Sequence, residues 1–181
     1  FNPNGNADEL GNKASVNPMS QDVAYDSTYG TLPVPVWPGH TFDGWYTAAS
    51  GGTKVTSATV VKITAAQTLY AHWTISSFTV TFNANGGSTP TATKTVKYLA
   101  LYGELPVPTR TGYTFAGWYT AASGGTKITK DSKVTITANV MLYAHWTANK
   151  YSVSFNANGG SLSSSDSKTV TYDAAYGTLP I

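Results

Sequence analysis

The sequence predicts a mainly β protein, α+β at most, built from small tandem repeat domains of about four strands each. The first observation behind this prediction is composition: 28 of the 181 residues are threonine, and aromatic residues make up 13%. Both kinds of residue are enriched in strands. The second observation is that apolar and polar residues alternate in short runs that end at glycine, asparagine or proline, which is typical of half-buried strands.

An internal repeat with an offset of 73 residues organises the chain. Residues 44–54 recur letter for letter as residues 117–127, and residues 70–74 recur as residues 143–147. A third, partial copy begins at Tyr151. A fixed period of this kind indicates a repeat array, in which each copy is one structural unit.

We therefore expect repeat one at residues 1–77, a complete repeat two at 78–150 and a partial repeat three at 151–181. Repeat one lacks the start of its first strand and carries an eight-residue insertion near residues 4–21 relative to repeat two. The linkers between repeats are only four residues long. Linkers this short prevent free tumbling, so we expect the repeats to form an elongated, semi-rigid rod.

Four strands are expected in repeat two, at residues 79–82, 95–98, 113–119 and 141–146. Residues 100–108 are the only plausible helical turn, and two prolines limit it to about one turn. A unit this small without a covalent crosslink needs a dense apolar core. From the apolar phase of the alternation we expect three pairs of side chains in the cores: Phe42 and Phe115, Leu69 and Leu142, and Val80 and Val153.

The partial repeat contains only the first two expected strands, at residues 151–156 and 168–172. An isolated two-stranded hairpin is marginal in water, so we expect Tyr151, Phe155 and Tyr172 to expose an apolar face. Two ways of completing this unit are open. The natural chain continues past residue 181, or strands are exchanged with another chain through residues 151–181.

Five short motifs occur in fixed order, at residues 80–87, 102–108, 112–119, 124–127 and 142–146. Together they resemble the Listeria–Bacteroides repeat, a family that includes the B-repeats of internalin-type bacterial surface proteins. The resemblance implies a β-grasp-like (ubiquitin-like) domain used in tandem, as a stalk or adhesive segment of secreted or wall-attached bacterial proteins. It implies no enzymatic activity and no ligand site that transfers residue by residue.

Several classes of function are disfavoured by the residues themselves. Lysine and arginine total 11 and do not cluster, which argues against nucleic-acid binding. The absence of cysteine excludes thiolate metal sites and cysteine nucleophiles, and no apolar run reaches the length of about 20 residues that spans a membrane. No acidic residue recurs at the repeat offset, so we expect no enzyme, no catalytic residues, no cofactor and no metal site.

The segment from Asn83 to Gly87 has a weak likeness to a calcium loop. Calcium prefers carboxylate ligands, whereas this segment offers asparagine. Asparagine followed by glycine is also a strong hairpin-turn signal. We therefore interpret this segment as a turn.

Repeated aromatic and histidine side chains are the candidate contact residues, either for a ligand or for a neighbouring repeat. Tryptophan and tyrosine alternate in the third strand of each repeat, so one of each pair is expected to point away from the core and could stack on a sugar. The competing interpretation is that these rings are covered by their own repeat or by the next one, and that the histidines only occupy a strand face. The candidates are Trp45, Tyr46, Trp118, Tyr119, His72 and His145.

We expect a non-catalytic tandem-repeat segment of an extracellular bacterial protein, on the cell surface or secreted, that acts as a stalk or spacer in adhesion. The neighbouring repeats of the same protein are the expected partners. Three alternatives are open: binding of a host surface protein or glycan by the repeats, a surface filament formed by strand complementation, and an accessory module of a secreted enzyme. The insertion in repeat one points toward the binding alternative.

Overall fold

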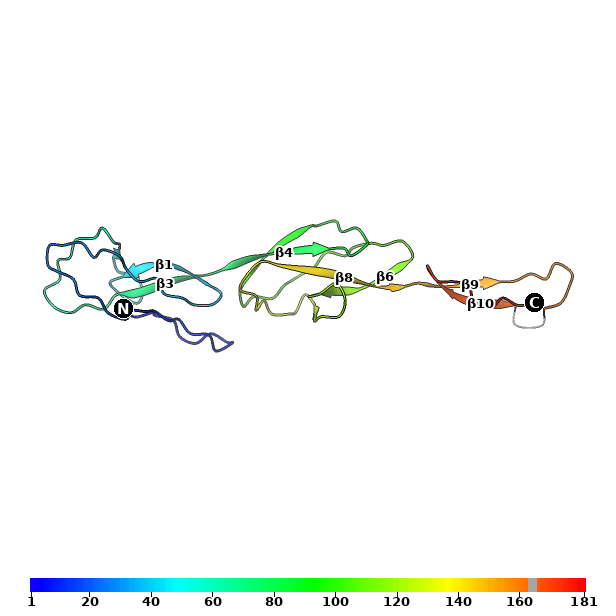
Figure 1. Cartoon of the computed structure of the whole chain (residues 1–181), viewed down its shortest axis with the longest axis horizontal. Coiled ribbons are helices and arrows are strands. Elements are labelled where there is room, and N and C mark those ends of the chain that lie inside the picture. Colours follow the sequence, from blue (N-terminus) through cyan, green and yellow to red (C-terminus); the bar gives the residue numbers. More distant parts are fainter. Residues whose placement is uncertain (163–165) are drawn as a thin grey trace. The chain divides into compact units, whose positions relative to one another are not determined.

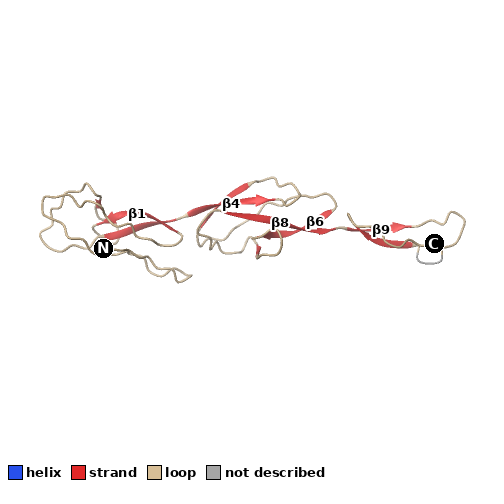
Figure 2. Cartoon of the chain, viewed as in Figure 1, coloured by secondary structure: helices blue, strands red, loops and turns tan. Residues whose placement is uncertain are grey.

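The computed structural model describes residues 1–162 and 166–181, and over this part of the chain it is all β, with strands and loops but no helix (Figure 2). The expected helical turn at residues 100–108 is therefore wrong. Leu99 adopts a left-handed conformation with φ of 62° at the entry to this segment, and Pro106 and Pro108 interrupt its end. These features favour an open loop over a helical turn.

The chain forms two compact units that do not follow the sequence repeats strictly. The first takes in Phe1–Phe78, Thr95–Leu101 and Lys133–Asn139. The second consists of the remaining segments, Thr79–Lys94, Tyr102–Ser132 and Val140–Ile181. Two short pieces of repeat two thus pack with repeat one.

A three-stranded antiparallel sheet lies in the first unit, in the order β2-β1-β3. The strands are β1 (His40–Tyr46), β2 (Lys54–Val55) and β3 (Tyr70–Ile75). Phe1 packs beside this sheet on a buried cluster, and the amide of Asn2 donates to the carbonyl of Leu69 at 2.8 Å. The buried cluster comprises Tyr29, Trp45, Val55, Val61, Leu69 and Ala71.

A sheet that lies mainly in the second unit has five strands in the order β5-β4-β8-β6-β7, although the start of β4 and most of β5 are assigned to the first unit. Its central pair, β4 and β8, is parallel, whereas β8 and β6 are antiparallel and lie side by side in Figure 1. The four expected strands of repeat two are confirmed, and β7 is an additional short strand. The strands are β4 (Ser77–Asn83), β5 (Thr93–Lys97), β6 (Tyr113–Tyr119), β7 (Lys127–Ile128) and β8 (Val140–Ala148).

A β-bulge occurs at the same place in β1 and β6. The pairing register shifts between Phe42 and Gly44 in β1, and between Phe115 and Gly117 in β6. The bulge glycines have φ of 143° and 141°, a conformation that side chains rarely adopt. The recurring glycine therefore reproduces a backbone feature, although the residue before it differs, Asp43 in β1 and Ala116 in β6.

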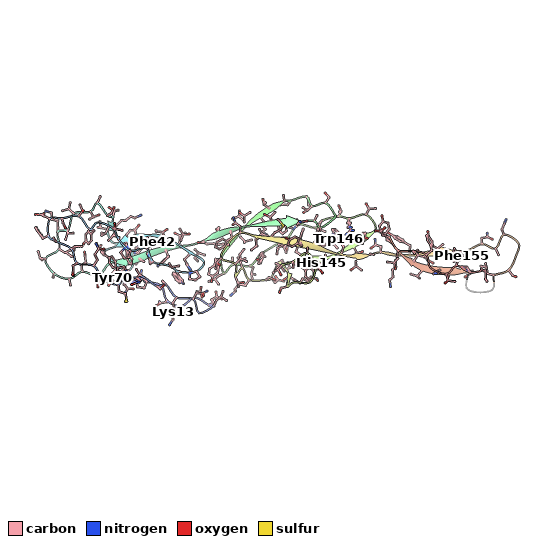
Figure 3. The ribbon with its side chains drawn as sticks, in the orientation of Figure 1. Lys13, Phe42, Tyr70, His145, Trp146 and Phe155 are labelled. Atoms are coloured by element: carbon pink, nitrogen blue, oxygen red, sulfur yellow. The ribbon has the colours of Figure 1, made fainter. Side chains whose placement is uncertain are left out.

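The partial repeat forms a two-stranded antiparallel ribbon of β9 (Lys150–Ser154) and β10 (Ser167–Thr171). The expected exposure of its apolar side chains is observed: Tyr151 is 49% exposed and Tyr172 is 39% exposed. Phe155, labelled in Figure 3, is half-buried. Both expected strands of this repeat are therefore present, and no complete core covers them.

The core predictions are confirmed for the aliphatic side chains of the complete repeats. Leu69, Leu142 and Val80 are all buried. The two phenylalanines are only half-buried, because each lies at the edge of a ring cluster in which its partners are tryptophans. Val153, in the ribbon, is also half-buried.

Replacing Leu142 with alanine should destabilise the second unit by about 2–5 kcal/mol, the usual cost of truncating a buried leucine. Leu142 is 2% exposed on β8, whereas its neighbour Met141 is 42% exposed. Met141→Ala is thus the matched control on the same strand. Urea denaturation should show the large loss only for Leu142→Ala, and equal losses in the two variants would contradict the core assignment.

Candidate functional site: a hollow that recurs in both units

Two of the expected contact residues, Trp45 and Trp118, are core residues in the structure. They are only 2% and 1% exposed. Each indole donates a 2.8 Å hydrogen bond to a proline carbonyl twelve residues earlier in the chain, Trp45 to Pro33 and Trp118 to Pro106. Their rings therefore offer no flat exposed surface to a ligand.

The other expected contact residues form a stacked pair in each unit. In the first unit the rings of Tyr46 and His72 lie 3.9 Å apart and nearly parallel, at 9°. Nε2 of His72 lies 3.0 Å from the carbonyl oxygen of Ala48. Because a carbonyl only accepts, this contact requires the tautomer with the proton on Nε2. The equivalent pair, Tyr119 and His145, stacks at 3.9 Å, and His145 contacts the carbonyl of Ala121 at 2.9 Å.

Beside each histidine lies a shallow open hollow with the same walls in the two units. Its volume is about 370 Å³ in the first unit and about 340 Å³ in the second. Figure 3 labels His145 and Trp146, which come from β8 and line the second hollow. The shared lining residues are Asn4, Ala49, Ser50, Gly51, His72 and Trp73, and their counterparts Asn85, Ala122, Ser123, Gly124, His145 and Trp146.

An asparagine that the sequence analysis interpreted only as a turn residue holds the wall together. In the second unit, Nδ2 of Asn85 donates to the carbonyls of Ala122 and Ala144 at 3.2 and 3.0 Å. Its backbone has φ of 49°, which asparagine tolerates better than most residues. Asn4 makes the same pair of bonds in the first unit. The recurrence of Asn–x–Asn in all three repeats is the signal that could have identified this residue.

The rim of the hollow differs between the units. In the first unit Trp37 stacks on His40 at 3.6 Å and 11°. In the second unit Arg110 occupies the equivalent position, with its guanidinium carbon 3.9 Å above the ring of Tyr113. Both arrangements present a flat group stacked on a ring, but only the second carries a charge.

The wall of the hollow is constant between the repeats, whereas the rim is not. Five of the eight positions from Val36 to Asp43 differ from their counterparts, whereas the following eleven residues are identical. Differences are about as dense from Asp22 to Thr31, where six of ten positions differ, and from Val55 to Thr68, where nine of fourteen differ. A constant wall with a variable rim can vary what it contacts without changing its fold.

A histidine lines each hollow, His72 in the first and His145 in the second, and Asp43 also lines the first. Within residues 1–162 and 166–181, no group of three or more histidine, aspartate or glutamate side chains is placed to bind a metal ion. Over the same residues, no buried side-chain nitrogen or oxygen lacks a hydrogen-bond partner. These walls are suited to contact through rings and hydrogen bonds.

The insertion of repeat one forms a polar cluster in the first unit. Tyr98 donates its hydroxyl proton to Oδ2 of Asp8 at 2.9 Å and accepts from Nδ2 of Asn12 at 2.9 Å. Burial pulls the pKa of Asp8 upward, but hydrogen bonds from Asn12, Tyr98 and Leu10 outweigh this effect and hold the pKa below its usual value. Burial, together with the bond to Asp8, raises the pKa of Tyr98.

A model of the Listeria-Bacteroides repeat domain matches residues 1–72, 78–145 and 151–181. Internalin H of Listeria monocytogenes is 44% identical over 115 residues, which cover 64% of this chain and 20% of that protein. Two proteins of Evansella cellulosilytica described as a putative Gly-rich membrane protein and a putative membrane protein are 35% and 37% identical, over 78% and 77% of this chain. The chain thus aligns with about a fifth of the length of these relatives.

Among the described residues, no helix is both long and apolar enough to cross a lipid bilayer.

Replacing Asn85 with glycine should destabilise the second unit by about 1–3 kcal/mol, because two hydrogen bonds worth roughly 0.5–1.5 kcal/mol each are lost. Asn158→Gly is the matched control for backbone flexibility. Asn158 has nearly the same φ, 47°, and the sequence holds no counterparts of Ala122 and Ala144 for it to bind. Urea denaturation in which both variants lose equally would assign the effect to flexibility.

The stability of the first unit should fall with acid more steeply in the wild type than in Asp8→Asn. The folded pKa of Asp8 is depressed, so the stabilisation it provides is present above its unfolded pKa near 4 and is lost as pH falls through the folded value. Melting temperatures measured from about pH 6 to about pH 2 test this. Parallel curves for the two proteins would refute it.

Proposed function

Because this chain belongs to the Listeria–Bacteroides repeat family, we propose that it is a non-catalytic segment of a bacterial cell-surface or secreted protein and acts as a stalk or spacer in adhesion. The likeness to internalin H and to two proteins described as membrane proteins supports a surface location. The chain spans about a fifth of those proteins, so the proposal concerns the repeat segment.

The observation that carries the stalk proposal is that the same structure-building contacts recur from repeat to repeat. The indole-to-proline bonds, the asparagine bonds and the tyrosine–histidine stacks are repeated with nearly the same distances. Such contacts satisfy polar groups of each repeat internally. Repeats that satisfy their own polar groups are suited to a tandem array. The stability of such an array is approximately the sum of the stability of each repeat and the contact energy between neighbouring repeats.

We also propose a β-grasp-like topology for each repeat, although no helix is present among the described residues. The support is the strand order of the second unit, in which the first and last strands of the repeat are parallel neighbours at the centre of the sheet. A β-grasp sheet has the same central pair. Boundaries at 1–77, 78–150 and 151–181 and an elongated arrangement of the repeats are part of this proposal.

A second candidate function is contact with a host protein or glycan through the recurrent hollows. The variable rim favours it, since Trp37 and Arg110 offer different chemistry above the same wall. Tyr46, Tyr119, His72 and His145 would then support the wall through their stacking. A pure spacer gives no reason for the rim to vary more than the wall.

Small-angle scattering of the full chain tests the stalk. A compact single domain of this length would have a radius of gyration of about 16 Å. We expect a value well above this, unchanged by salt, because the short linkers and not charge attraction would keep the repeats extended. A value near that of a compact domain would contradict the proposal.

A glycan array probed with the labelled chain tests the second function. Trp37→Arg should alter the set of glycans bound, because it replaces the rim ring with the charge found at Arg110. Val34→Arg is the control, since Val34 is 74% exposed and lies outside the hollow. If Val34→Arg alters glycan binding as much as Trp37→Arg does, the effect reflects the added charge alone. If the wild-type chain binds no glycan, the result favours the spacer function.

A further inference from the structure

A tyrosine at one position of the repeat is placed in the same way in both compact units. Tyr98, from sequence repeat two, lies in the first unit against Gly39, where an added Cβ would come within 2.3 Å of the tyrosine ring. Tyr172, from the partial repeat, lies in the second unit against Gly112, where an added Cβ would come within 2.4 Å of the ring. Only glycine leaves room for the ring at these two turns, which have φ of 72° and 76°.

The residue after each glycine also carries a ring, and this ring contacts the tyrosine. His40 meets Tyr98 edge-on, with ring centroids 5.8 Å apart at 75°. Tyr113 meets Tyr172 at 5.5 Å and 75°. Edge-to-face contacts of this kind are favourable for aromatic rings, and the geometry is retained although histidine replaces tyrosine.

Backbone hydrogen bonds tie each tyrosine to its glycine turn through one linker residue. The amide of Ser76 donates to the carbonyl of Gly39 at 2.9 Å, and the amide of Tyr98 donates to the carbonyl of Ser76 at 3.0 Å. The linker side chain adds a hydrogen bond to the strand after the turn, with Thr41 in the first unit and with Thr114 in the second. The equivalent bonds run from Asn149 to Gly112 at 2.9 Å and from Tyr172 to Asn149 at 2.8 Å.

The insertion of repeat one is an addition to this arrangement and not its cause. Asp8 and Asn12 bind the hydroxyl of Tyr98, and Tyr98 is only 2% exposed, whereas Tyr172 is 39% exposed. Yet the glycine contact, the edge-on ring and the backbone bonds are present for both tyrosines. The shared features thus belong to the repeat itself.

Tyr25 occupies the equivalent position in repeat one. The residue that follows it, Asp26, has φ of 64°, close to the 62° of Leu99 and the 61° of Asp173 that follow the other two tyrosines. The ring of Tyr25, however, is 59% exposed. The ammonium of Lys62 lies 5.3 Å from the centre of this ring.

We propose that this tyrosine is the docking element through which each repeat attaches to the repeat before it. Its partner is a left-handed glycine turn followed by an aromatic or histidine ring, as at Gly39–His40 and Gly112–Tyr113. Tyr25 is the docking element for a turn of the same kind in a repeat placed upstream in the same polypeptide. The contacts of Tyr98 and Tyr172 define what the partner looks like. Tyr25 is exposed and is the docking element that is free to bind such a partner.

The two tyrosine–glycine contacts that the structure shows are tested in the full chain by pairs of substitutions. Gly39→Ala and Gly112→Ala should lower the melting temperature by roughly twice as much as Gly51→Ala and Gly124→Ala. The control glycines have similar φ, 67° and 68°, but nothing within 4 Å of an added Cβ, so they report the backbone strain alone. In a Tyr98→Ala background, the excess effect of Gly39→Ala should vanish. An excess that persists without the tyrosine ring would overturn the proposal.

The free docking element is tested by nitration of tyrosine with tetranitromethane, followed by peptide mass spectrometry. In the full chain Tyr25 should react much faster than Tyr98. In a chain extended by a second copy of residues 78–154 fused ahead of Phe1, the reaction of Tyr25 should slow toward the rate of Tyr172, which makes the same contacts without the insertion. Gly→Ala at the added counterpart of Gly112 should restore the fast reaction. Equal rates at Tyr25 in the original and extended chains would refute docking.

Discussion

The buried indole of each complete repeat is the contact on which the rest of the structure depends. Trp118 packs against Phe82 and Phe115, and its ring nitrogen fastens the loop at Pro106 to β6. No helix covers the sheet among the described residues and the sequence has no cysteine, so few other groups can bury area on this scale. Trp45 makes the same bond in the first unit, to the carbonyl of Pro33. The proline loop and the bulged strand therefore meet at this ring in each unit.

The strands could be predicted from sequence because alternation and turn residues are local signals. The aromatic strand β6 and the final strand β8 were expected within one or two residues of their observed ends. The parallel pairing of β4 with β8 was not predicted, since it joins segments about sixty residues apart and no local pattern records it. The expected turn at residues 100–108 failed because Leu99 adopts a left-handed backbone, which leucine rarely does.

The candidate site was only partly accessible to sequence reasoning. The internal repeat identified Tyr46, His72 and their counterparts as candidates. It could not predict that Trp45 is buried, because alternation along a strand separates two faces but does not indicate which face is buried. The rim was overlooked because candidates were sought among residues that are identical between the repeats, and the rim residues differ. Tyr98 and Gly39 were overlooked for another reason. Each recurs in the next repeat, yet their contact joins residues of different repeats, which a comparison made within one repeat cannot reveal.

The composition of the first compact unit has a consequence for the order in which the chain folds. This unit includes Thr95–Leu101 and Lys133–Asn139, so a chain that leaves the ribosome or an export channel from its N-terminus cannot complete it until residue 139 has emerged. Contacts that close such long loops form late. Gly39 lacks the ring of Tyr98 until residue 98 has emerged, and the segment Lys133–Asn139 joins the unit later still. Each compact unit would thus be completed by segments of the following repeat. The array would fold from its N-terminus onward, with each unit folding only after the next repeat has been synthesised.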